Sequence, residues 1–173
     1  MAKRIGLART QALIENLKRE LNLSSTTLKD AAQVRRVKAV SAATTLTNAD
    51  SGALITLSGN DYVVKLPKAP EVGCTYTFIN PVTLGGDGVN IDAFDGTHFF
   101  LGKVEDRETT GTDSAAHVSF NGSSHDQVKF SASAGAADNQ IKCTFIDNNT
   151  WLLHDSFSFD ISDITAGAAS TNA

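Results

Sequence analysis

After residue 34 the sequence consists of short runs rich in Val, Ile, Thr and Phe, separated by clusters of Gly, Asn, Asp and Ser. Runs of this length between turn residues predict many short β-strands. We expect the strands at residues 34–40, 53–57, 62–66, 74–79, 89–94, 98–104, 117–120, 127–131, 141–146, 151–154 and 156–161. Because no helical pattern is interleaved with them, residues 34–165 are predicted to form a mainly β domain, a β-sandwich or jelly-roll-like fold.

Side-chain alternation indicates which residues of two strands face the core. Apolar residues occupy one face of each strand and Thr or Lys the other, and the apolar sets are Cys74, Tyr76 and Phe78, and Ile141, Cys143 and Phe145. Both cysteines are therefore expected to be small core residues with free thiols. The alternative is a disulfide between them, which would require an oxidising compartment.

Residues 1–33 have a helical pattern instead. Good helix formers without proline run from residue 2 to residue 23, and the apolar residues recur every three or four positions. The apolar stripe of this amphipathic helix consists of Leu7, Leu13, Ile14, Leu17 and Leu21. A second short piece, helical or irregular, is expected at residues 27–33. We expect this arm to bury its stripe only against another chain, and residues 166–173, which are small and polar, to form a flexible tail.

The charges are divided between the arm and the remainder of the chain. Residues 1–40 carry nine basic and three acidic side chains, whereas residues 41–173 carry six basic and sixteen acidic ones. The net charge of the whole chain is -4. A basic arm ahead of an acidic body predicts docking to an acidic surface, and an ordinary solvated helix face is the alternative. Arg4, Arg9, Arg35 and Arg36 are the candidate contacts, since a guanidinium can bind a carboxylate through two hydrogen bonds.

The sequence contains no motif for catalysis. The four histidines lack metal-ligand spacing, and no nucleophile motif, phosphate-binding loop or pattern of basic and aromatic residues for nucleic acid is present. Residues 85–92 approximate one copy of a calcium-binding β-roll turn, but a single copy favours a Gly-rich hairpin. We therefore expect no catalytic residues, no cofactor, no metal and no nucleic-acid partner. Without a signal peptide or an apolar membrane helix, the chain is expected to be made in a cytoplasm.

Two stretches resemble a pattern common in virion proteins of tailed bacteriophages. The first is Thr-Leu-Thr at residues 45–47 with Asp-Ser-Gly at 50–52, followed by two strands, the second ending in Leu-Pro, and then by a glycine and an aromatic strand. The second is residues 143–151, a strand, an Asp/Asn turn and Trp151. The basic opening, residues 1–23, resembles the starts of cyanophage structural proteins.

This resemblance implies a small β domain of the capsid decoration, or cement, type. Such a protein would bind the outer surface of the major capsid protein, as a homotrimer, and stabilise the shell without chemistry. Its localisation would be the virion, and the apolar and basic residues of the arm named above would form the interface. The alternative is a tail, neck or fibre component that acts as a binding module for a host polysaccharide or an adaptor protein.

Overall fold

The computed structural model describes residues 11, 26–29, 32–94, 96–107, 117–130, 139–147, 149–158 and 164–167. The elements are β1 (Thr26–Lys29), β2 (Ala32–Arg35), β3 (Val37–Val40), β4 (Thr44–Thr45), the 3₁₀ helix η1 (Asn48–Asp50), β5 (Leu54–Leu57), β6 (Asn60–Lys65), β7 (Thr75–Ile79), β8 (Gly85–Asp92), β9 (Phe99–Asp106), β10 (His117–Asn121), β11 (Gln127–Phe130), β12 (Gln140–Asp147), β13 (Thr150–Leu153), β14 (Phe157–Ser158) and β15 (Ile164–Gly167). Strands dominate the described part of the chain, which confirms the prediction of a mainly β fold.

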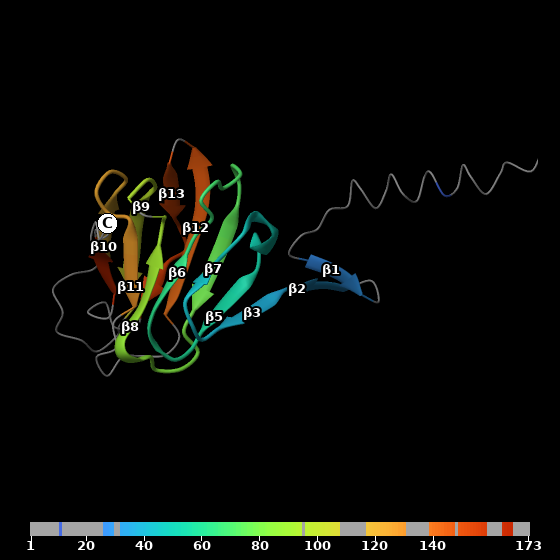
Figure 1. Ribbon diagram of the computed structural model, residues 1–173, viewed down its shortest axis with the longest axis horizontal. Coiled ribbons are helices and arrows are strands. Elements are labelled where there is room, and N and C mark those ends of the chain that lie inside the picture. The colour runs from blue at the N-terminus through green and yellow to red at the C-terminus, as the bar shows by residue number, and fades with distance from the viewer. Residues whose placement is uncertain are drawn as a thin grey trace, which may run out of the picture.

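Two large sheets share one hydrophobic core (Figure 1). The eight-stranded sheet has the order β10-β9-β13-β12-β7-β5-β3, with β14 beside β12 and β9. The five-stranded sheet has the order β15-β11-β8-β6-β4. Buried residues of both sheets, among them Tyr76 and Phe78 of β7 and Val64 of β6, belong to the same cluster, so the inner faces of the sheets lie against each other.

The chain from β3 to β8 alternates between the two sheets. The strands β3, β5 and β7 are parallel neighbours in the larger sheet, and β4, β6 and β8 are parallel neighbours in the smaller one. Each parallel connection therefore passes through the opposite sheet, and this part of the chain winds as a flattened coil. Antiparallel β12 and β11 then pair with β7 and β8. A jelly roll consists of antiparallel strands, so these parallel pairs distinguish this fold from a jelly roll.

Aromatic side chains fill the centre of the core. The ring centroid of Trp151 lies 5.7 Å from that of Tyr76 and 5.1 Å from that of Phe145. Trp151 is fully buried. The Tyr76 hydroxyl donates a 2.7 Å hydrogen bond to the carbonyl oxygen of Thr47, which satisfies its polar end inside the protein. Cys74 and Cys143 are buried and free, as their alternation predicts.

The structure corrects two expectations about the ends of the chain. Residues 26–29 and 32–35 pair as the antiparallel strands β1 and β2 where a helical or irregular piece was expected, because Thr and Val at these positions favour extended backbone. Residues 166 and 167, expected in the tail, belong to β15, which pairs with β11. The helix expected at residues 2–23 and residues 168–173 lie outside the described residues, apart from Gln11.

The Cys143 thiol should be less reactive than a free cysteine in solution. Burial raises the pKa of the Cys143 thiol, so at neutral pH it is protonated and a poor nucleophile. In a Cys74→Ser variant, we expect Cys143 to react with a water-soluble disulfide reagent far more slowly in the native protein than in urea. Labelling at the same rate in both conditions would show that Cys143 is not in the core.

Candidate functional site

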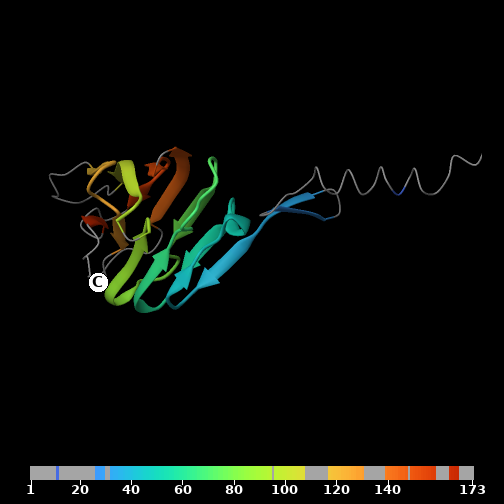
Figure 2. The same ribbon diagram turned by 45° about the horizontal axis from the view of Figure 1, so that its top comes forward.

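The hairpin formed by β1 and β2 stands away from the two large sheets (Figure 2). Arg36 alone separates β2 from β3, which is the last strand of the eight-stranded sheet. Two of the predicted interface residues, Arg35 and Arg36, lie at this junction. The apolar stripe Leu7, Leu13, Ile14, Leu17 and Leu21, and Arg4 and Arg9, lie outside the described residues.

Both arginines of the junction bind the body of the protein. The Arg35 Nη2 donates to the Thr77 hydroxyl at 2.7 Å and its Nε to the carbonyl oxygen of Gly52 at 3.0 Å. The Arg36 Nη2 donates to the carbonyl oxygen of Ala49 at 2.7 Å. A guanidinium has five N–H donors, so each arginine keeps only part of its donors for an external carboxylate. The base of the hairpin is held by these contacts.

The carboxylate of Asp50 connects η1 to the edge strand. Its Oδ2 accepts hydrogen bonds of 3.0 Å from the backbone N–H and the hydroxyl of Thr47. Its Oδ1 lies 3.1 Å from both the Arg36 guanidinium and the Lys38 ammonium. Burial, the largest influence, raises the pKa of Asp50, but the hydrogen bonds from Thr47 and Lys38 together lower it below 3.8. The sequence indicated only a turn here, although Thr47 three residues before Asp50 is the spacing of a capping interaction.

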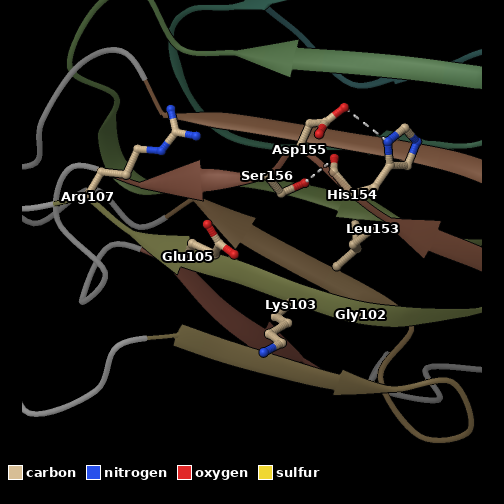
Figure 3. A pocket seen from close by; sticks show the side chains of 8 residues that line it. All are labelled: Gly102, Lys103, Glu105, Arg107, Leu153, His154, Asp155 and Ser156. Atoms are coloured by element: carbon tan, nitrogen blue, oxygen red, sulfur yellow. Dashed lines mark hydrogen bonds and ion pairs between the residues drawn. The ribbon is translucent and has the colours of Figure 1, made fainter.

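A cleft of about 260 Å³ opens on the eight-stranded sheet (Figure 3). Its lining residues are Gly102, Lys103, Glu105, Arg107, Leu153, His154, Asp155 and Ser156. The cleft lies where the parallel partner of β9 changes from β13 to β14: Leu101 is opposite Leu152, and Glu105 is opposite Phe157. Between these pairs the chain leaves the sheet and turns at Asp155, whose φ of 49° is left-handed.

Side chains of both charges surround the cleft. The His154 Nε2 lies 2.7 Å from the Thr144 hydroxyl, and its Nδ1 lies 3.4 Å from Asp155 Oδ2. Lys142 Nζ donates to the same carboxylate oxygen at 2.9 Å. The hydrogen bond from Lys142, followed by that from His154, lowers the pKa of Asp155, so this exposed group stays ionised at neutral pH. The arrangement suits binding of a small polar molecule.

The consecutive residues His154, Asp155 and Ser156 are the residue types of a hydrolase triad, but their geometry differs from one. The Ser156 hydroxyl accepts from the Lys142 N–H at 2.9 Å and lies 3.2 Å from two backbone carbonyl oxygens. The His154 Nε2 faces Thr144 instead of Ser156. A triad requires the base to contact the nucleophile, so these three residues are not arranged for nucleophilic catalysis. Sequence reasoning missed this cleft because β9 and β13 are distant in sequence.

The Gly-rich stretch at residues 85–92 is strand β8, parallel to β6, so its interpretation as a hairpin was wrong. The Asp61 carboxylate accepts a hydrogen bond from the Asp87 N–H and occupies the space beside Gly86. Within the described ranges no group of three or more His, Cys, Asp or Glu side chains could hold a metal ion. In the same part of the chain, no helix combines the length and the apolar character that a membrane crossing requires.

Comparison of the chain with models of protein families, with curated proteins and with solved structures gave no match. The function is therefore inferred from the geometry of the hairpin base, the edge strand and the cleft.

The Asp50 cluster should make the protein sensitive to acid. The pKa of Asp50 is lower in the folded than in the unfolded chain, so its contribution to stability is present above pH 3.8 and is lost as the pH falls through the folded-state pKa. Asp50→Asn should lower the free energy of unfolding at neutral pH by about 1–3 kcal/mol and flatten its dependence on pH in this acidic range. Urea titrations at several pH values measure both effects.

Asp155→Asn is the control for this experiment, because it removes an exposed carboxylate of another ion pair. It should leave the stability at neutral pH nearly unchanged. An equal loss in both variants would contradict the role of the Asp50 cluster.

The floor of the cleft should tolerate no side chain at Gly102. A Cβ on Gly102, whose φ is +126°, would lie 2.6 Å from the carbonyl oxygen of Leu153. Gly73 has a φ of +91° with no atom within 4 Å of such a Cβ, so Gly73→Ala isolates the backbone strain. We expect Gly73→Ala to cost about 1–2 kcal/mol and Gly102→Ala at least about 1 kcal/mol more, from denaturant unfolding. Equal losses would mean that β9 and β13 can separate at this point.

Proposed function

We propose that this protein is a structural component of a tailed-phage virion, a capsid decoration protein that binds the outer surface of the major capsid shell. Its β-sandwich body would sit on the shell as a homotrimer, and residues 1–35 would reach the shell. Many copies bound at repeated positions would stabilise the particle through multivalent contact. No chemical step is part of this function.

The observation that carries the proposal is the projecting hairpin. Among the described strands it makes no ladder with either large sheet, and a two-stranded hairpin alone is marginally stable in water. Its base, however, is anchored by Arg35 on Thr77 and by Arg36 on Asp50. An element that is held at its base and lies outside both large sheets is suited to bury its surface against a partner. The basic residues that precede it favour an acidic partner surface.

A tail, neck or fibre component is the second candidate, and the polar cleft favours it. The cleft volume of about 260 Å³ is of the size of one sugar ring, and Glu105, Asp155 and His154 are suitable partners for hydroxyl groups. The two candidates differ in copy number. Quantified gels of purified particles would show a copy number close to that of the shell subunit for a decoration protein, and a far smaller one for a tail component.

The decoration proposal is tested by binding to shells that lack the protein. We expect Arg4→Gln combined with Arg9→Gln to weaken binding by a few-fold to about tenfold, and to reduce its dependence on salt, since exposed ion pairs contribute about 0.2–1 kcal/mol each. Co-sedimentation of the full-length chain with shells at increasing salt gives both quantities. The matched control, Lys103→Gln with Lys129→Gln, removes the same charge from the body.

Equal weakening in the two double variants would contradict docking through the arm. Full occupancy of the arm variant at high salt would show that apolar burial, through residues such as Leu13 and Leu17, holds the protein in place. Absence of binding by the wild-type chain would overturn the decoration proposal itself.

A further inference from the structure

The coil of parallel strands is open at its first turn. Among the described strands, β3 has a single neighbour, β5, and β4 has a single neighbour, β6, so both large sheets end at the same turn of the chain. Strand β2, which leads into β3 through Arg36, pairs only with β1. One side of β3 therefore presents backbone groups that no described strand covers.

The hydrogen bonds to β5 show which residues of β3 face the open side. The N–H of Leu54 donates to the carbonyl oxygen of Arg36 at 2.9 Å, and that of Ser58 to the carbonyl oxygen of Val40 at 3.0 Å. Backbone groups alternate sides along an extended strand, so Lys38 faces β5 as well. The N–H and C=O groups of Val37 and Ala39 consequently point away from the sheet.

This edge lacks the usual protection against strand addition. Exposed edges are commonly blunted by charged side chains, proline or bulges. Here the outer-face residues are Val37, which is 59% exposed, and Ala39, and none of the prolines, at positions 67, 70 and 81, belongs to β3. The charged Lys38 side chain is held by an ion pair with Asp50.

We propose that the free edge of β3 is the docking site for an extended acidic segment of a partner chain, which adds as a further strand to the eight-stranded sheet. This inference rests on the proposed function and specifies how the protein would bind a segment of the shell protein. Backbone hydrogen bonds to Val37 and Ala39 would supply affinity, as in other cases of strand addition. Alternate side chains of the added segment would lie on the face that carries Arg36 and Lys38, and these two cations would set its charge.

Charge distinguishes this occupant from a second copy of the chain. Arg36 and Lys38, which flank Val37, share the single carboxylate of Asp50, whereas Arg35 binds Thr77 and Gly52. Antiparallel pairing of β3 with its own copy would bring the two sets of cationic side chains close together, and like charges across strands are unfavourable. The carboxylates of an acidic segment would instead pair with these cationic side chains.

The test uses the full-length chain and two synthetic probes, a short peptide of alternating Glu and Val and its Lys and Val counterpart. Hydrogen exchange of the backbone amides is measured with and without each probe. We expect the acidic peptide to protect the amides of Val37 and Ala39, and the basic peptide to protect neither. Val37→Pro removes an outward N–H without removing a hydrogen bond to β5, and should weaken binding of the acidic peptide by about tenfold or more.

Val37→Thr is the matched control, because it keeps the N–H and favours extended backbone. It should bind the acidic peptide as the wild type does. Ala39→Pro provides a second variant, and thermal unfolding identifies either proline variant that fails to fold. Protection confined to another strand, equal binding of both peptides, or unchanged binding by both folded proline variants would overturn the inference.

Two further outcomes separate this inference from the proposed function. Concentration-dependent protection of Val37 without any probe would identify a second copy as the occupant and overturn the inference. Shell binding that survives Val37→Pro unchanged would leave the decoration proposal standing while removing its edge-strand mechanism. Binding of the acidic peptide without any binding to shells would overturn the decoration proposal and leave strand addition at β3 standing.

Discussion

The contact of Trp151 with Tyr76 and Phe145 joins the strands on which the rest of the structure depends. These three rings belong to β13, β7 and β12, neighbours at the middle of the eight-stranded sheet. Tyr76 also binds the carbonyl oxygen of Thr47 and so places η1 beside the core. Because η1 carries Asp50, the position of the hairpin base follows from the packing of this centre. On the other side, β13 leads directly from Trp151 into the turn that shapes the cleft.

Asp50 connects η1, which lies beside the core, to the residues of the edge strand β3 and its junction with β2. Burial of a carboxylate is costly unless it is paired, and here Thr47, Arg36 and Lys38 supply the partners. The same contacts hold the side chains of Arg36 and Lys38 beside Asp50, and Val37 and Ala39 supply the exposed side chains of β3. A structural requirement of the interior thus produces the bare edge on which the proposed docking rests.

The candidate functional regions could be predicted from the sequence only in part. The surplus of basic residues in the arm and the candidate residues Arg35 and Arg36 are visible in the sequence, but their binding to Thr77, Gly52 and Ala49 is not. The cleft was missed entirely, since it forms where β9 exchanges β13 for β14 as its neighbour. Motif spacing cannot show such a place, because its residues are brought together by strand order alone.

The sequence by itself determined the mainly β fold, most strand positions and the inward faces of strands such as β7 and β12, because alternation and turn residues act over a few neighbouring positions. Only the tertiary structure decided which sheet each strand joins. The turn at residues 58–61 has the composition of a hairpin, yet it connects β5 to β6 across the two sheets, and β5 finds its partners in β3 and β7. The reason is physical: a turn sets the local direction of the chain, whereas the partner of a strand is chosen by burial of apolar faces contributed from the whole chain.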